Sequence, residues 1–181
     1  MTLILGITGL MAAGKGTAAK YIKEKYGVST YTFSTMLGDA LDRFYLERSR
    51  DNFIKISEAI RGTFGEDVMA RTMAKDVEKD DNKIIVIEGV RRMADIEYLK
   101  KMPGFILVEI FADIKTRFER LKKRSEKSDD AVKTFAQFEA DHQRSTELST
   151  VEVAKYASVR IDNNGDLPKL YKQLENFIGN R

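Results

Sequence analysis

The chain has 181 residues, 43% of them hydrophobic and 33% charged, so a single domain with a sizeable buried core is expected. Only 2 prolines and 12 glycines exclude collagen-like, Pro-rich and disordered classes. The net charge of +3 does not predict a nucleic-acid binder. The absence of cysteine excludes disulfides and thiol catalysis, and the presence of only one histidine, His142, excludes a multi-histidine metal site.

Short apolar runs alternate with longer helical patterns along the chain. Strands are predicted at 3–7, 29–33, 84–87, 105–111 and, more weakly, 157–161. Helices are predicted at 15–26, 53–64, 67–79 and 167–178, the last with Asp166 as its N-cap. This alternation predicts an α/β fold with three layers around a parallel sheet. The long connection between the second and third strands leaves room for two or three helices.

A glycine-rich segment follows the first strand and fits the spacing GxxxxGK from Gly9 to Lys15. Small residues allow several backbone N–H groups to converge on phosphate oxygens, and the next helix directs its positive N-terminus at the same anion. Lys15 would reach the outer phosphates. The residues expected to bind phosphate are Gly9, Ala12, Ala13, Gly14, Lys15, Gly16 and Thr17.

The candidate metal site departs from the usual motif. Gly16 stands where the motif normally has a hydroxyl that binds Mg²⁺. Thr17 comes one residue later, so it is a weaker candidate for the metal and better suited to an inner phosphate. Glu88 ends the third strand beside the loop, where a carboxylate can hold Mg²⁺ through water.

Two groups of arginines offer guanidinium groups to a transferring phosphoryl group. Arg91 and Arg92 follow the third strand, directly after Glu88 and Gly89. After the fourth strand comes a second group on one predicted helix face, and a polar helix with Asp141 follows it. This second group consists of Arg117, Arg120 and Arg124, with Arg144 on the polar helix. The residues expected to act in catalysis are Lys15, Arg91, Arg120 and Arg124. The alternative for both groups is an ordinary solvated charged surface.

Together these segments resemble the adenylate-kinase-like nucleoside monophosphate kinase branch of the P-loop kinases, and within it a P-loop family related to adenylate and dephospho-CoA kinases. The matching segments are 9–17, 33–37, 88–91, 117–121, 128–130 and 161–165. The resemblance covers nearly the whole chain. It implies a single P-loop domain over 1–181, with a five-stranded parallel core, an acceptor-binding helical insertion at 34–75 and a short lid at 121–140.

The resemblance also implies roles for individual residues. ATP with Mg²⁺ would be the donor, and Asn164 and Gly165 would lie against its adenine. The lid would carry the four arginines after the fourth strand. The acceptor would be bound by Ser34, Arg61, Gly89, Arg91 and Arg92. Related kinases carry an acceptor-phosphate arginine where this chain has Gly38, so either Arg43 or Arg61 replaces it or the acceptor differs.

The expected function is transfer of the γ-phosphoryl group of ATP to a nucleoside or deoxynucleoside monophosphate. A dephospho-CoA kinase is one alternative, but its hydroxyl acceptor needs an acidic base, and the turn after the second strand has Ser34 and Thr35 with Asp39 farther on. A nucleotide-binding switch or assembly ATPase is another. No apolar run nears the roughly 18 residues of a membrane span, and the first residues lack a basic targeting region. We expect a cytoplasmic monomer or homodimer whose partner is a small nucleotide, without membrane or nucleic-acid partners.

Overall fold

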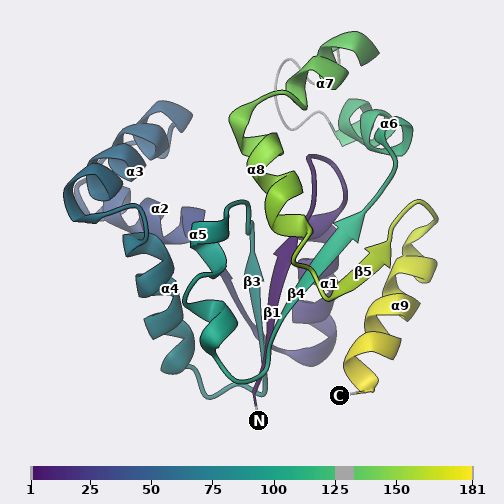
Figure 1. The fold of residues 1–181 in the computed structure, drawn as a ribbon, viewed down its shortest axis with the longest axis horizontal. Coiled ribbons are helices and arrows are strands. Elements are labelled where there is room, and N and C mark those ends of the chain that lie inside the picture. Colours follow the sequence, from purple (N-terminus) through teal and green to yellow (C-terminus); the bar gives the residue numbers. More distant parts are fainter. Residues whose placement is uncertain (1, 125–132, 181) are drawn as a thin grey trace.

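A computed structural model describes residues 2–124 and 133–180 and contains one parallel sheet with helices on both faces (Figure 1). The sheet has five strands in the order β2-β3-β1-β4-β5, and every neighbouring pair is parallel. The strands are β1 (Leu3–Thr8), β2 (Ser29–Thr32), β3 (Ile84–Glu88), β4 (Phe105–Phe111) and β5 (Val159–Asp162). The predicted fold class, an α/β fold with a five-stranded parallel sheet, is confirmed.

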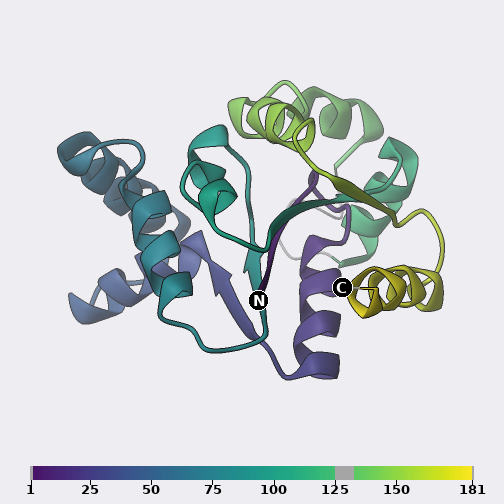
Figure 2. The same ribbon diagram turned by 60° about the horizontal axis from the view of Figure 1, so that its bottom comes forward.

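The helices divide into layers around this sheet (Figures 1 and 2). One face is covered by α1 (Lys15–Tyr26) and α9 (Leu167–Gly179), and the other by α4 (Val68–Glu78), α5 (Met93–Ile96), the 3₁₀ turn η1 (Leu99–Lys101) and α8 (Ser145–Ala154). The helices α2 (Phe33–Arg43) and α3 (Arg50–Phe64) precede α4 and form an arm beside the sheet. Beyond the end of β4 lie α6 (Ile114–Arg124) and α7 (Phe135–Asp141).

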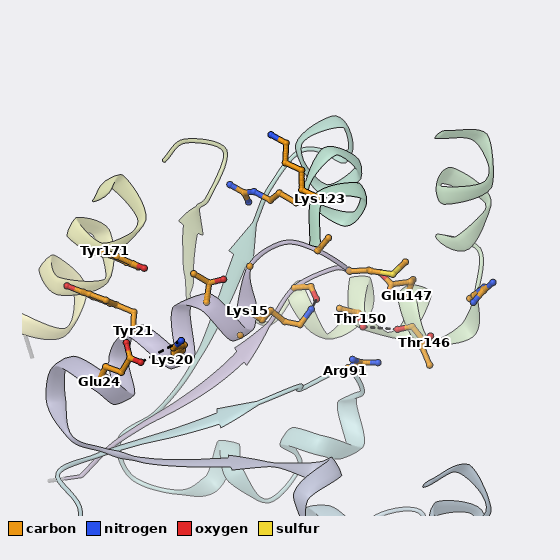
Figure 3. A pocket seen from close by; sticks show the side chains of 18 residues that line it. Lys15, Lys20, Tyr21, Glu24, Arg91, Lys123, Thr146, Glu147, Thr150 and Tyr171 are labelled. Carbon is orange, nitrogen blue, oxygen red and sulfur yellow. Dashed lines mark hydrogen bonds and ion pairs between the residues drawn. The ribbon is translucent and has the colours of Figure 1, made fainter. Parts of the chain in front are cut away.

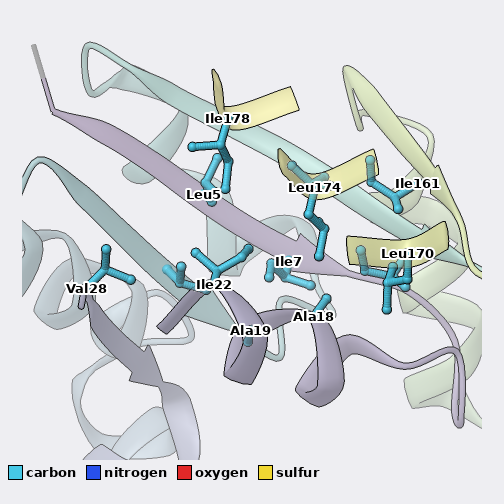
Figure 4. Close-up of a cluster of buried hydrophobic side chains, with 13 residues drawn as sticks. Leu5, Ile7, Ala18, Ala19, Ile22, Val28, Ile161, Leu170, Leu174 and Ile178 are labelled. Atoms are coloured by element: carbon cyan, nitrogen blue, oxygen red, sulfur yellow. The ribbon is translucent and has the colours of Figure 1, made fainter. Parts of the chain in front are cut away.

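The central strand β1 is covered on both faces, as its continuous apolar sequence predicts. Successive side chains of a strand point to opposite faces. Leu5 and Ile7 pack with Ile22 of α1 and Leu174 of α9, whereas Ile4 belongs to the core on the other face (Figure 4). The two cores hold β1 rigidly, so the loop that follows it starts from a fixed point.

Helix boundaries follow the capping residues, including two that the sequence did not predict. The side chain of Asp166 accepts a hydrogen bond from the Lys169 N–H (3.0 Å), which confirms Asp166 as the N-cap of α9. The Thr32 side chain accepts the Thr35 N–H (2.9 Å), so a helix begins at Phe33, which was predicted to be strand. The polar helix predicted to carry Asp141 and Arg144 is in fact two helices, because Arg144 is the N-cap of α8.

Candidate functional site

The phosphate loop joins β1 to α1 and can be formed only with glycine at its two key turns. Gly9 has φ 143°, and a Cβ atom there would come within 2.3 Å of the Ile110 carbonyl oxygen. Gly14 has φ 101° and forms the N-cap of α1, where a Cβ atom would come within 2.2 Å of Asn163 Nδ2. L side chains rarely adopt these φ values. The GxxxxGK spacing therefore has a steric basis in this chain.

Side chains from three other elements hold the backbone of the loop. Asn163, after β5, donates a hydrogen bond to the Ala13 carbonyl oxygen (2.8 Å) and is only 3% exposed. Arg117 of α6 donates to the Met11 carbonyl oxygen (3.2 Å), and Glu147 of α8 accepts from the Met11 N–H (3.0 Å). Sequence reasoning missed Asn163 and Glu147 as site residues. The one available signal was that Asn163 follows a buried strand at the carboxyl edge of the sheet.

Lys15 lies across the mouth of the loop. Its Nζ donates hydrogen bonds to the carbonyl oxygens of Gly9 (2.6 Å) and Leu10 (3.0 Å). The ammonium group is thus placed over the loop at the start of α1, where the partial positive charge of the helix N-terminus adds to its own. An anion bound here would meet both charges.

A first cavity of about 1000 Å³ opens over the loop and along α1 (Figure 3). Arg91, Thr146 and Glu147 lie on one side of Lys15, and the stacked rings of Tyr21 and Tyr171 lie on the other. Of the expected phosphate-binding residues, the cavity is lined by Gly9, Ala12, Gly14, Lys15, Gly16 and Thr17. The side chain of Ala13 is buried and does not line the cavity.

A second cavity of about 450 Å³ lies between the end of β3 and the arm formed by α2 and α3. Its cationic residues are Lys15, Arg61, Arg91 and Arg92, and its apolar residues include Phe33, Leu37, Phe53 and Met69. Ser34, Gly89 and Glu88 also line it. All five residues predicted to bind the acceptor therefore lie in one cavity.

The two cavities meet at a shared wall. Four residues line both of them, namely Lys15, Gly16, Arg91 and Thr146. The first three were expected at the site, whereas Thr146 was not. A group bound at this wall would be open to both cavities, which is the arrangement that direct transfer between two bound molecules requires.

Glu88 lines the second cavity, next to Gly16 of the shared wall. Its Oε2 would be 3.8 Å from a Cβ atom at position 16, so the carboxylate lies close to the loop and no side chain of residue 16 stands between them. Burial raises the pKa of Glu88 above its ordinary value, while the charges of Lys15 and Lys23 act in the opposite direction. Among residues 2–124 and 133–180, no three histidine or carboxylate side chains gather as a metal cluster.

Asp95 of α5 fixes the turn that carries the two arginines after β3. Its Oδ2 accepts hydrogen bonds from the backbone N–H groups of both Arg91 and Arg92, each 2.9 Å long. Burial raises the pKa of Asp95, although these N–H groups and the nearby Arg61 and Arg92 charges favour its ionised form. No motif or spacing in the sequence singles out this aspartate.

Arg61 is the arginine that the arm contributes to the second cavity. It donates hydrogen bonds to the Glu66 carbonyl oxygen (2.9 Å) and to Ser57 Oγ (3.3 Å). Arg43, the other candidate replacement, does not line this cavity. Gly38 packs against the guanidinium group of Arg48, whose Cζ would be 2.9 Å from a Cβ atom at that position.

The arginines expected in the lid have different surroundings. Arg117 is buried and faces the phosphate loop, and its Nε donates to the Ala112 carbonyl oxygen (3.0 Å). Arg120 lines the first cavity and donates to the Gly165 carbonyl oxygen (3.2 Å), and burial lowers its pKa. Arg144 lines the same cavity and pairs with Asp141 (2.7 Å). The side chain of Arg124 and the whole of 125–132, including the matching segment 128–130, lie outside the described residues.

The two residues expected at the adenine contact the neighbouring backbone. Asn164 Oδ1 accepts a hydrogen bond from the Asp113 N–H (2.7 Å), and Gly165 accepts from Arg120. Neither residue lines the first cavity, whereas Tyr171, farther along α9, does. In the part of the chain that the structure describes, no helix has the length and apolar character needed to cross a membrane.

Comparison with known proteins identifies both the family and the fold. A family model described as an AAA domain matches residues 8–137. A UPF0200 protein of Methanothermobacter thermautotrophicus is 27% identical over 97% of this chain and 89% of its own length. A UPF0200 protein of Sulfurisphaera tokodaii is 31% identical over 70% of this chain and 68% of its own length.

Solved structures share the fold at low sequence identity. TT1252 from Thermus thermophilus superposes with a TM-score of 0.66 and 17% identity, covering 99% of this chain and 97% of its own. Shikimate kinase from Bacteroides thetaiotaomicron superposes with a TM-score of 0.64 and 16% identity, covering 98% of each chain. These likenesses and the geometry of the loop show the P-loop kinase fold. The chain therefore belongs to the UPF0200 proteins, within the family of the matched AAA domain.

Proposed function

We propose that the protein is an ATP-dependent phosphotransferase that moves the γ-phosphoryl group of ATP to a nucleoside or deoxynucleoside monophosphate. The observation that carries this proposal is the shared wall of the two cavities. Lys15, Gly16 and Arg91 face both cavities, so a phosphoryl group bound there would be open to a donor on one side and an acceptor on the other. A protein that only hydrolyses its nucleotide has no need of the second cavity.

The second cavity fits an acceptor that is anionic at one end and flat and apolar at the other. Arg61, Arg91 and Arg92 supply three guanidinium groups, which match phosphate oxygens in geometry and charge. Phe33 and Phe53 supply aromatic surface against which a base can pack. A nucleoside monophosphate has both features.

The proposed reaction needs no general base. An oxygen of the acceptor phosphate attacks the γ-phosphorus of ATP, a new P–O bond forms, and the bond to the β,γ-bridging oxygen breaks to release ADP. The acceptor oxygen is already anionic, so no proton has to leave. Lys15 and Arg91 would stabilise the charge that spreads over the migrating group, and Arg120 would add to this from the donor side.

Magnesium ion, when bound with the nucleotide, would neutralise part of the charge of the donor phosphates. Glu88 is the residue that fits this ion best, because it is a carboxylate that lines the second cavity and lies close to the loop at Gly16. Thr17 lines the first cavity and suits an inner phosphate. Because the described residues contain no carboxylate cluster, the phosphates and water would supply most of the ligands.

The surroundings of Asp39 support a monophosphate acceptor over a hydroxyl acceptor such as dephospho-CoA. Asp39 does not line the second cavity. It lies at the surface, where its Oδ1 is 3.6 Å from Arg48 Nη2. Asp95 does line this cavity, but its Oδ2 is occupied by two backbone N–H groups. Neither aspartate is therefore placed as a free base for a hydroxyl.

A coupled assay of ADP formation from ATP across all nucleoside monophosphates, dephospho-CoA and shikimate tests the proposal. Shikimate belongs in the panel because a shikimate kinase shares the fold. We expect ADP formation that depends on a monophosphate and is abolished by Lys15→Ala, which controls for contaminating kinases. ADP formation that no acceptor accelerates would support the switch or assembly ATPase instead.

Arg91→Ala separates the acceptor site from the donor site. Loss of one charge-assisted contact of about 1.5–3 kcal/mol should raise the KM of the acceptor roughly ten- to a hundredfold. The matched control is Arg43→Ala, because Arg43 lies in the same arm and does not line the second cavity. A larger rise in the KM of ATP than of the acceptor would move Arg91 to the donor side.

A further inference from the structure

Side chains from two helices that are far apart in the sequence bind the crest of the phosphate loop, which is Met11. Both backbone polar groups of Met11 have side-chain partners: Glu147 Oε2 accepts from its N–H at 3.0 Å, and Arg117 Nη1 donates to its carbonyl oxygen at 3.2 Å. Glu147 lies in the first turn of α8 and Arg117 in α6. Two successive peptide units of the loop are therefore fixed from outside it.

Both partners are buried, which makes these contacts strong and specific. Glu147 is 9% exposed and Arg117 is 4% exposed. Arg117 is fixed in turn by the Ala112 carbonyl oxygen (3.0 Å) and by the Phe138 ring, whose centroid is 5.6 Å from its Cζ. Charged groups lose water on burial and retain a single geometry only where hydrogen bonds replace that water.

The next residue explains why the crest needs such support. Ala12 has φ 62°, a left-handed conformation that residues with a side chain rarely adopt. A residue in this region remains there only where its surroundings determine its conformation. Ala12 lines the first cavity, so this turn sets where the backbone N–H groups beyond Met11 point.

We infer that Glu147 is a positioning residue of the phosphate loop: its carboxylate holds the Met11 N–H, opposite Arg117 on the Met11 carbonyl, and so keeps the Ala12 turn in the form that binds the phosphates of a nucleotide. The inference rests on the proposed function only in that the loop binds nucleotide phosphates. It requires no acceptor and no transfer. Figure 3 shows Glu147 beside the loop and pointing toward it.

The competing explanation is electrostatic. A carboxylate in the wall of an anion site repels phosphate, so Glu147 would then weaken nucleotide binding and its removal would strengthen it. The two explanations predict opposite signs for the same variant. Nucleotide affinity of the whole protein therefore decides between them.

The experiment measures the Kd of MgADP by titration calorimetry for the full chain and for Glu147→Gln and Glu147→Ala. Glutamine keeps an amide oxygen for the Met11 N–H, so its Kd should stay within about threefold of the original protein. Alanine removes the acceptor, and we expect affinity to fall about tenfold or more. Glu152→Ala is the matched control, because Glu152 lies on the same helix, is exposed and pairs with Lys155 (2.6 Å).

Amide hydrogen exchange at Met11 distinguishes positioning from a general loss of stability. Exchange should accelerate in Glu147→Ala but not in Glu147→Gln, because only alanine frees the N–H. Glu147→Asp, one methylene shorter, should resemble alanine and serves in its place if alanine does not fold. Tighter MgADP binding in Glu147→Ala, or unchanged Kd with unchanged Met11 exchange, would overturn the inference. Failure of the phosphotransferase assay alone would leave these measurements intact.

Discussion

Replacement of Asp95 tests whether the arginine turn after β3 is built by one buried carboxylate. A single oxygen, Oδ2, accepts both the Arg91 and the Arg92 N–H at 2.9 Å. Asp95→Ala leaves two backbone donors without this partner, at about 1–3 kcal/mol for each fully buried group. Both bonds are only partly buried, so water will replace some of the loss, and we expect a decrease of about 2–3 kcal/mol in the free energy of unfolding.

Asp95→Asn separates the hydrogen bonds from the charge. The asparagine oxygen can occupy the position of Oδ2 and accept both bonds, but they lose the strengthening that a charged acceptor gives. Loss of the charge also removes the cost of burying it, and burial is the largest influence on the pKa of Asp95. The two changes oppose each other, so Asp95→Asn should lie within about 1 kcal/mol of the original protein.

Urea unfolding at two pH values provides the measurement. Because the pKa of Asp95 is raised in the folded state, its stabilising contribution is fully present below the unfolded value of about 3.9 and is lost as pH rises through the folded value. Relative to Asp95→Asn, the original protein should therefore gain stability on acidification. An Asp95→Ala variant as stable as the original protein, with an unchanged acceptor KM, would refute this account of the turn.

Three further variants follow from the site. Glu88→Gln should reduce the rate and make it less responsive to Mg²⁺. Because burial raises the pKa of Glu88, the acid limb of the pH–rate profile of the original protein should lie above the ordinary glutamate pKa of about 4.3, and the variant should lack this limb. Arg120→Ala should lower kcat and kcat/KM together by about tenfold, with partial recovery in Arg120→Lys, whereas equal rates in all three proteins would exclude a role in transfer. Asn163→Ala should lose about 1–3 kcal/mol in urea unfolding, because the buried Ala13 carbonyl oxygen loses its donor; an unchanged midpoint would contradict this.

Much of the fold could be predicted because its strands are covered on both faces. The apolar runs of β1 and β3 and the helical spacing of α9 show directly in the sequence, and the glycines of the loop mark its turns. The boundary at Phe33 was wrong because its aromatic side chain favours a strand, whereas the Thr32 cap starts a helix there. Local capping outweighed strand propensity at this point.

The residues that support the site were harder to predict than those that line it. Lys15 and Arg91 belong to motifs close to the strand ends, so their positions follow from the order of elements. Glu147 and Asn163 contact backbone that is distant in the sequence, across 136 and 150 residues respectively, and such tertiary contacts leave no periodic signal. Asp95 binds backbone only 3–4 residues away, but nothing in its pattern separated it from other aspartates in helix first turns.

The arm that lines the second cavity differs from the sheet in how many of its side chains are buried. No described side chain of α3 is fully buried, and α2 buries only Leu37, Gly38 and Leu41. By contrast, β1 is paired on both sides and buried nearly throughout. Segments with few buried contacts open at a small fraction of the global free energy of unfolding.

The two halves of the site would therefore belong to different cooperative units. Opening of the arm would remove one wall of the second cavity but leave the loop, β1 and α1 in place. In the proposed phosphotransfer, a molecule in this partly open state would still bind its nucleotide but would lack the surface that binds the acceptor. An acceptor that binds only the closed arm stabilises that arm by mass action, so substrate itself would complete the folding of the surface that recognises it.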